Sequence, residues 1–178
     1  MNPRLAWAPL IVAALASCAT GRPAISPVAS VDLPRFMGDW YVIAHIPSPP
    51  EREAYDAVES YRLDADGRIR TTFRYRKGGF DAPPETMEPV GTVVPGTHNA
   101  VWGMQFVWPV KAEYVIVDLA PDYSRTIIGR SKRDYVWLMA RTPSLPEAEL
   151  KSAIARIGAL GYDTTKLRMV PQSAAASR

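Results

Sequence analysis

The feature that most constrains the fold is a regular series of short alternating segments between residues 36 and 141. Within each segment apolar and polar side chains alternate, and Gly, Pro, Asp or Asn residues separate most segments from the next. Alternation with a period of two is typical of half-buried strands, and its repetition indicates an antiparallel barrel or sandwich. We predict eight strands, at residues 39–45, 57–63, 68–76, 88–94, 100–108, 112–119, 125–130 and 135–141.

The alternation also assigns the two faces of each strand. In the segment 68–76, Phe73 and Tyr75 share one face, while Arg70 and Arg74 share the other, so one face is wet. The segments 100–108 and 135–141 carry large aromatic stripes. In a sandwich these stripes would interdigitate as core, whereas in an eight-stranded barrel they would line a lumen that holds one small ligand.

One helix is expected after the last strand. Ser144 and Glu147 have the spacing of a capping box, and Leu150, Ile154 and Ile157 recur at i, i+4 and i+7. A single apolar stripe predicts that this helix packs on the outside of the sheet.

The N-terminus has the features of an export signal. Arg4 precedes an apolar run at residues 5–15, which is too short to span a bilayer. The run ends in Leu-Ala-Ser before Cys18, which resembles a bacterial lipobox, in which the signal is cut before a cysteine that becomes lipidated. An ordinary signal peptide with a chance cysteine is the alternative. Lipidation would explain the single unpaired cysteine. By resemblance to Gram-negative lipoproteins, Ala19 after it favours the outer membrane over retention at the inner one, and we expect attachment on the periplasmic side.

We therefore divide the chain into a signal peptide (1–17), a lipid-anchored tether rich in Pro, Ala and Ser (18–34), a barrel domain (35–172) and a loose tail (173–178). The 21 basic against 18 acidic residues give a net charge of +3, which offers no reason to expect a nucleic-acid partner. Two histidines and one cysteine leave little material for metal or thiol chemistry, so neither a metal nor a cofactor is expected.

Three motifs resemble those of the lipocalin family. Gly38 and Trp40 form Gly-x-Trp on the first strand, Asp122 and Tyr123 lie between the sixth and seventh strands, and Arg141 ends the eighth. The lipobox and the string RDYVWLMARTP are similar to the bacterial outer-membrane lipoprotein lipocalins related to apolipoprotein D. The resemblance implies an all-β fold, an eight-stranded antiparallel up-and-down barrel with one C-terminal helix packed outside.

The resemblance also implies how one end of the barrel is closed. In an up-and-down barrel the first and last strands are antiparallel neighbours, so Trp40 and Arg141 lie at the same end. By resemblance, the guanidinium crosses the indole and plugs that end, and a guanidinium can stack on the ring while donating hydrogen bonds. Gly38 leaves room for this close approach. These motif residues are therefore expected to be structural, and the ligand is expected at the other end.

The period of two predicts which side chains face the lumen. The predicted ligand-binding residues are Val42, Ala44, Tyr61, Phe73, Tyr75, Trp102, Met104, Phe106, Tyr114, Ile116, Ile127, Tyr135, Trp137 and Met139. This lining is apolar with tyrosine hydroxyls, which suits an acyl chain. A lumen packed completely by its own aromatic side chains is the alternative.

Four charged residues are candidates for contact with a lipid head group. Arg130 ends the seventh strand at the predicted mouth and Lys132 and Arg133 follow it, where they would attract a carboxylate or phosphate. A solvated set of mixed loop charges is the alternative. Glu59 has the parity of the lumen residue Tyr61, so it either faces inward, bonded to a tyrosine, water or head group, or is turned outward by a bulge.

These patterns favour a binding protein over an enzyme. The only cysteine lies in the signal region, and neither His45 nor His98 has a recognisable nucleophile or acid partner. We expect binding, storage or transport of a fatty acid or lysophospholipid at the bacterial envelope, with membrane attachment through the N-terminal lipid. A structural or interaction lipoprotein with a filled barrel is the alternative, and a homodimer stays open.

Overall fold

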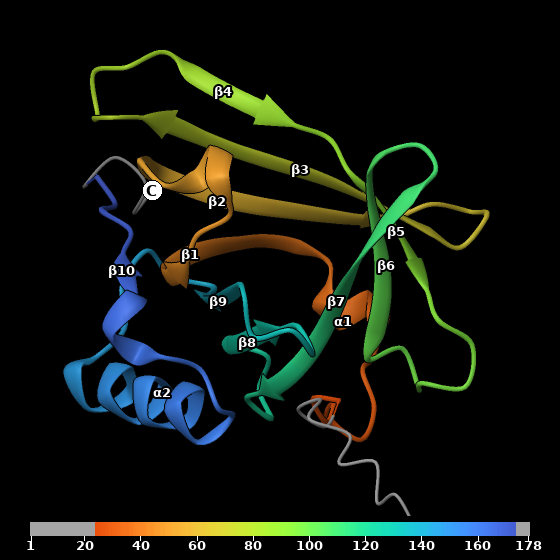
Figure 1. Cartoon of the computed structure of the whole chain (residues 1–178). Coiled ribbons are helices and arrows are strands. Elements are labelled where there is room, and N and C mark those ends of the chain that lie inside the picture. Colours follow the sequence, from red (N-terminus) through yellow and green to blue (C-terminus); the bar gives the residue numbers. More distant parts are fainter. Residues whose placement is uncertain (1–23, 174–178) are drawn as a thin grey trace, which may run out of the picture.

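The structure is a computed structural model, and it describes residues 24–173. Its strands form a closed antiparallel barrel with eight positions around the wall, because β4 and β5 both pair with β3 and β9 returns to β1. The strands are β1 (Gly38–Ile46), β2 (Ala54–Leu63), β3 (Arg68–Lys77), β4 (Pro84–Met87), β5 (Val90–Val93), β6 (Val101–Val107), β7 (Val110–Leu119), β8 (Arg125–Gly129) and β9 (Val136–Ala140). The predicted barrel is confirmed (Figure 1).

The fourth wall position differs from the single strand predicted at residues 88–94. It consists of β4 and β5, with Glu88 and Pro89 between them. Proline has no N–H to donate to a ladder, so an unbroken strand through this point is disfavoured. The split lengthens this side of the barrel, since β4 extends along β3 toward its C-terminal end.

A bulge in β1 changes which side chains face the interior. The register of the β1–β9 pairing shifts between Val42 and Ala44. As a result Ala44 lies opposite Leu138 in the cluster outside the barrel, and His45 lies opposite Trp137 on the inner side. The predicted lumen position of Ala44 is therefore wrong, because one extra residue in a strand reverses the alternation beyond it.

The same kind of correction applies to Ile127 on β8. The regular β8–β9 pairing places Ile127 opposite Leu138, among the residues that pack outside the barrel. Its neighbour Ile128 lies opposite Trp137 and belongs to the interior cluster instead. The lumen prediction for Ile127 is therefore wrong: β8 alternates without a break, but its inward positions are Thr126 and Ile128, opposite Met139 and Trp137.

The helix α2 (Glu147–Ala159) packs against this outer cluster through Ala153 and Ile157. The expected capping box does not form, because the helix begins at Glu147 with Pro146 at its N-cap. Beyond the helix, a 3-10 turn η2 (Thr164–Lys166) leads to the short β10 (Arg168–Met169), which pairs with β1. No helix in the described part of the chain has the length and apolarity needed to cross a bilayer.

Residues 25–31 form what we call the N-terminal strap. Ile25 and Val31 are buried, and the strap donates backbone hydrogen bonds from Val28 to the Ile116 carbonyl and from Val31 to the His98 carbonyl. The helix α1 (Leu33–Phe36) follows the strap. The stretch expected to belong to a tether therefore packs on the barrel from Ile25 onward, because its scattered apolar side chains find partners that composition alone does not reveal. The predicted signal peptide, Cys18 and residues 174–178 lie outside the described residues.

Candidate functional site

Arg141 closes one end of the barrel. Its guanidinium carbon lies 3.8 Å from the centroid of the Trp40 ring, and its nitrogens donate to the Asp39 carbonyl at 2.7 Å and to the carbonyls of residues 35–37 at 2.9–3.0 Å. Gly38 has a φ of +92°, and a Cβ there would stand 3.5 Å from a guanidinium nitrogen. Stacking and four hydrogen bonds together fix the indole as the floor of the barrel.

The second motif braces the same end. The Tyr123 hydroxyl accepts a hydrogen bond from the Asp32 backbone N–H at 2.9 Å, and Arg35 lies over the Tyr123 ring at 4.0 Å. Asp122 accepts hydrogen bonds from both the backbone N–H and the hydroxyl of Ser124, which lower the pKa of the Asp122 carboxyl. The motif residues thus hold α1 across the closed end.

Aromatic side chains fill the interior above this floor. The Phe36 ring lies 5.0 Å from Trp40 and 5.4 Å from Trp102, and Trp102 stacks on Tyr114 at 5.0 Å. Five of the predicted lumen residues belong to this packed interior and do not line the open cavity: Val42, Tyr61, Trp102, Ile116 and Met139. Tyr75, near the mouth end of β3, is also buried outside the cavity lining, and its hydroxyl donates to Glu85 at 2.7 Å. The alternative of a barrel filled by its own side chains therefore holds for the closed half.

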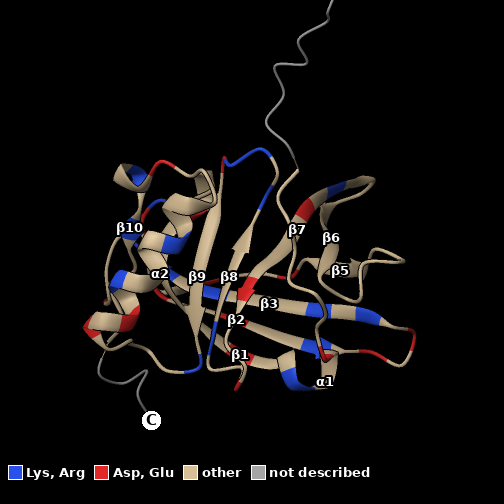
Figure 2. Ribbon diagram, turned by 90° about the horizontal axis from the view of Figure 1, so that it is seen from below, with Lys and Arg blue, Asp and Glu red and all other residues tan. Residues whose placement is uncertain are grey.

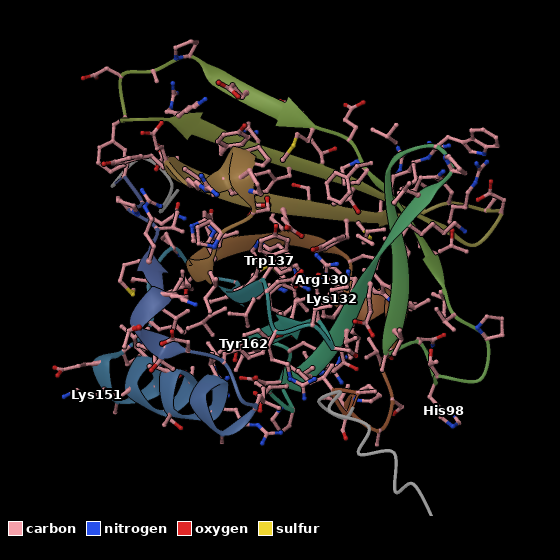
Figure 3. The ribbon with its side chains drawn as sticks, in the orientation of Figure 1. His98, Arg130, Lys132, Trp137, Lys151 and Tyr162 are labelled. Atoms are coloured by element: carbon pink, nitrogen blue, oxygen red, sulfur yellow. The ribbon has the colours of Figure 1, made fainter. Side chains whose placement is uncertain are left out.

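The mouth half contains a cavity of about 410 Å³. Six predicted lumen residues line it: Phe73, Met104, Phe106, Tyr114, Tyr135 and Trp137. Sequence parity missed the part of the lining that comes from the β1–β2 loop and from the break between β4 and β5: Ser48, Pro50, Glu51, Met87 and Pro89. Figure 3 shows Trp137 and Arg130 near the centre of the barrel, with His98 far off at the closed end.

Glu59 faces this cavity, which decides between the two orientations that its sequence left open. The Tyr61 hydroxyl donates to the Glu59 carboxyl and lies 2.6 Å from the Tyr114 hydroxyl, so three polar groups are linked. Burial, with a smaller contribution from the charge of Glu51, raises the pKa of Glu59 to about 8. At neutral pH the carboxyl is therefore mostly protonated and contributes a hydrogen-bonding group without a charge.

A second polar cluster holds the β1–β2 loop over the cavity. We call it the Glu51 cluster, and it consists of His45, Ser48, Glu51 and Trp137. The 3-10 turn η1 (Pro49–Glu51) brings in Glu51, whose carboxylate accepts from Ser48 Oγ and Trp137 Nε1, each at 2.7 Å. Buried His45 places Nδ1 at 3.5 Å from the same carboxylate, and neither ring nitrogen forms a hydrogen bond. The β1 bulge turns His45 into this cluster, and no pattern in the sequence marks that bulge.

The candidate head-group cations occupy three different environments. Arg130 lines the cavity, with a guanidinium nitrogen 3.4 Å from the Asp134 carboxylate. Lys132 is exposed on the β8–β9 loop. Arg133 instead donates to the Leu160 carbonyl at the end of α2, since its left-handed backbone (φ +53°) turns the side chain toward the helix. Arg133 does not line the cavity.

This arrangement suits a ligand that is mostly apolar. Aromatic, Met and Pro side chains form much of the lining, and its polar groups belong to Ser48, Glu51, Glu59, Thr71, Glu113, Tyr114, Arg130 and Tyr135. The Thr71 hydroxyl is buried without a hydrogen-bond partner. Within residues 24–173, no group of three or more His, Cys, Asp or Glu side chains is placed to hold a metal ion. The cavity offers apolar burial together with a small number of orienting hydrogen bonds.

Comparison with known proteins agrees with this geometry. The sequence model of the family described as "Lipocalin-like domain" matches residues 31–172. The chain is 30% identical to temperature-induced lipocalin-1 of Arabidopsis thaliana, over 86% of each chain, and 28% identical to outer membrane lipoprotein Blc of Vibrio cholerae, over 83% of this chain and 86% of that protein. Among solved structures, insecticyanin of Manduca sexta is similar in fold, with a TM-score of 0.67, 20% identity and 88% coverage of each chain.

Proposed function

Because the chain belongs to the lipocalin family, whose members generally bind or transport small hydrophobic ligands, we propose that its cavity holds a single-chain lipid. The ligand is a fatty acid or a lysophospholipid with its acyl chain in the cavity. The observation that carries this proposal is the cavity of about 410 Å³ above a closed floor, lined mainly by apolar side chains. Pockets of about 300–1,000 Å³ are the usual size for small ligands.

The energetics of an acyl chain fit this cavity. Burial of each CH₂ group contributes about 0.8 kcal/mol, so a chain of about 16 carbons gains on the order of 10 kcal/mol before entropic costs. After those costs the remainder is enough for binding at about micromolar concentration or tighter. One acyl chain makes fuller use of a cavity of this size than two, which favours fatty acids and lysophospholipids over diacyl lipids.

The positions of the charges favour a head group at the mouth. Glu59 lies deep, beside Tyr61 and Tyr114, where an anionic head group would be repelled whenever the carboxyl ionises. Arg130 lines the cavity, and its Nε is buried without a hydrogen-bond partner. A carboxylate or phosphate near Arg130 would gain a charge-assisted hydrogen bond while its tail extends down toward Phe73 and Met104.

We place this activity at the bacterial cell envelope. The relatives named outer membrane lipoprotein Blc match over most of this chain, and the lipobox before Cys18 supports attachment through a lipidated cysteine. The proposed location is the periplasmic side of the outer membrane. Mass spectrometry of the wild type beside Cys18→Ala tests the anchor, because only the wild type is expected to carry the added mass of the lipid.

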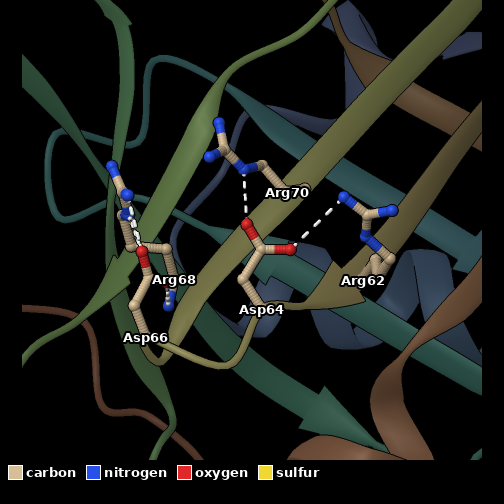
Figure 4. A network of polar contacts seen from close by, with 5 residues as sticks. All are labelled: Arg62, Asp64, Asp66, Arg68 and Arg70. Carbon is tan, nitrogen blue, oxygen red and sulfur yellow. Dashed lines mark hydrogen bonds and ion pairs between the residues drawn. The ribbon is translucent and has the colours of Figure 1, made fainter.

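The rival function is an interaction lipoprotein that binds a partner through the arginine row on β3. Figure 4 shows why this surface is less suited to an anionic partner: Asp64 pairs with Arg70 at 2.6 Å and with Arg62 at 3.3 Å, and Asp66 pairs with Arg68 at 2.5 Å. Nearby carboxylates thus neutralise much of the positive field. The open cavity also argues against a filled barrel.

Delipidated protein titrated with palmitate and with a C16 lysophospholipid tests the proposal. Saturable change in tryptophan emission near one ligand per chain is expected, because Trp137 lines the cavity. Ala112→Phe, which adds a ring to the cavity wall, should weaken binding at least tenfold. The matched control is Ala155→Phe on the exposed face of α2, which should bind as the wild type does. No binding by a folded wild type would overturn the proposal.

A further inference from the structure

The hairpin between β6 and β7 ends in an unusually apolar tip. Phe106, Val107, Trp108 and Val110 have exposed fractions of 55, 72, 83 and 69%, whereas the other exposed large apolar side chains of the described residues reach at most 47%. We call residues 106–110 the mouth tip, because Phe106 also lines the cavity. Such a cluster of exposed apolar side chains beside an opening marks an interaction surface.

The N-terminal strap shows which end of the barrel the anchor reaches. Ile25 donates its backbone N–H to Ser131 Oγ on the β8–β9 loop at the mouth, whereas Val31 bonds to His98 at the closed end. The chain therefore enters the described fold at the mouth. Cys18 precedes Ala24 by six residues, a span of about 20 Å at full extension. A lipid on Cys18 would thus hold the mouth close to the membrane.

The charges beside the mouth tip differ from those on the β1–β2 and β3–β4 loops, where Glu53 and Asp81 are exposed. Lys111 directly follows the mouth tip, with its Nζ 3.5 Å from the Thr92 hydroxyl, and Lys132 lies on the β8–β9 loop; both lysines are exposed. The two carboxylates near these lysines already have partners. Glu113 accepts two hydrogen bonds from Ser131, and Asp134 pairs with Arg130. Figure 2 shows basic residues on this loop and on the β6–β7 hairpin, toward the upper side of the view.

We propose that the mouth tip inserts into the interfacial region of a lipid bilayer, with Lys111 and Lys132 contacting lipid phosphates, so that the cavity opens onto the membrane. A Trp with flanking lysines beside apolar side chains is the composition of interfacial anchors. The docking itself does not depend on the ligand. That the cavity exchanges lipid with this bilayer rests on the proposed function, and the orientation rests on the proposed lipidation of Cys18.

The test uses the full-length protein with its natural processing, reconstituted into vesicles of phosphatidylethanolamine and phosphatidylglycerol that contain lipids brominated on the upper acyl chain. The contribution of Trp108 to the fluorescence is obtained by subtracting the emission of Trp108→Ser from the emission of the wild type. We expect bromine to quench at least about half of it. As a matched control, Val94→Trp in the Trp108→Ser background places a tryptophan in the exposed β5–β6 loop at the closed end and should remain unquenched.

The charge component has its own variants. Lys111→Glu with Lys132→Glu should reduce the quenching of Trp108 at least twofold, whereas Arg62→Glu at the closed end should leave it unchanged. Quenching of the Val94→Trp tryptophan, with Trp108 unquenched, would overturn the proposal by showing the opposite orientation. Disulfide-linked dimers of Val107→Cys would also overturn it, because the tip would then contact a second copy of this chain.

A filled-cavity variant separates this proposal from the proposed function. Ala112→Phe is expected to dock as the wild type does and yet to take up no lipid from the vesicles. Docking without uptake by the wild type itself would remove the lipid-binding function and leave the membrane contact standing. If the wild type takes up lipid from the vesicles while Trp108 stays unquenched, the lipid-binding function stands and the proposed docking of the mouth tip is overturned.

Discussion

The two ends of this barrel differ in how completely their polar groups are satisfied. At the closed end, Arg141 has four carbonyl acceptors and an aromatic ring within reach, and Trp40 donates its indole N–H to the Phe36 carbonyl at 2.8 Å. In the mouth half, the Thr71 hydroxyl and Arg130 Nε are buried without hydrogen bonds, and both residues line the cavity. The comparison indicates that one end supplies stability while the other retains groups that a ligand can satisfy.

The largest expected effect tests the closed end. Trp40→Ala should lower the free energy of unfolding by about 3–5 kcal/mol, because it leaves a cavity and removes the surface on which Arg141 stacks. Urea unfolding followed by circular dichroism measures the change. Trp108→Ala is the matched control at the mouth, with an expected change within about 0.5 kcal/mol. An altered ligand preference in Trp40→Ala, with unchanged stability, would break the comparison.

The next expected effect tests Glu59, whose carboxyl is buried in the mouth half. Glu59 has a pKa of about 8 in the fold against 4.5 as its ordinary value, so the folded state retains a proton that the unfolded state has lost. Stability should therefore fall as the pH rises from about 4.5 to about 8. Glu59→Gln should remove this fall and be more stable than the wild type by a few kcal/mol at pH 9, since each unit of pKa shift corresponds to about 1.4 kcal/mol.

The control for this prediction is Glu88→Gln, an exposed side chain between β4 and β5. It should follow the wild-type dependence of stability on pH, measured as urea midpoints from pH 4.5 to 9. A wild type whose midpoints show no fall across this range would mean that Glu59 is already charged and stabilised in the cavity.

A smaller effect is expected from the loop over the mouth. Glu51→Gln should cost about 1 kcal/mol, because the amide can still accept a hydrogen bond from Trp137 but loses the negative charge beside His45. The looser loop should release lipid several times faster in stopped-flow experiments. Glu53→Gln, exposed just beyond the same loop, serves as the control. Equal release rates for all three proteins would show that the Glu51 cluster does not gate the cavity.

The smallest effect concerns ion pairs on the outside of the closed end. Asp64→Asn removes the partner of Arg62 and Arg70, and exposed pairs of this kind contribute about 0.5 kcal/mol or less. Thermal unfolding at low and high salt measures the difference, which should disappear at high salt. A loss comparable to that of Trp40→Ala would mean that surface charges, and not the plugged floor, stabilise this end.

The resemblance to the lipocalin motifs predicted the closed end, and the physical chemistry of the residues agrees with it. Trp40 and Arg141 lie at adjoining ends of neighbouring strands, and a guanidinium on an indole needs little else to be specified. The Gly-x-Trp spacing, the order of the strands and the closure of the barrel all place Trp40 and Arg141 at the same end. The confirmed fold class follows from the same consistency between local pattern and topology.

The mouth half could be predicted only in part. A bulge leaves no mark in a run such as Ile43-Ala44, where both residues are apolar, so parity failed for Ala44. At Ile127 and Ile128 both residues are again apolar, so the sequence does not show which of them faces inward. The depth of the cavity depends on how Phe36 and Trp102 meet, which is a matter of rotamers and not of pattern. The approach of Glu51 to Trp137 depends on the path of a loop rich in proline, which alternation cannot trace.

The plug made by Arg141 also has a consequence for the order of folding. Its guanidinium bonds to carbonyls that precede it by 102 to 106 residues. For a chain that emerges from its N-terminus, β1 and α1 must wait until β9 has arrived before their end of the barrel can close. Contacts of such long range make folding slow, commonly on the scale of milliseconds to seconds. Closure by Arg141 is therefore a late step, and until then the chain stays open to chaperones and proteases.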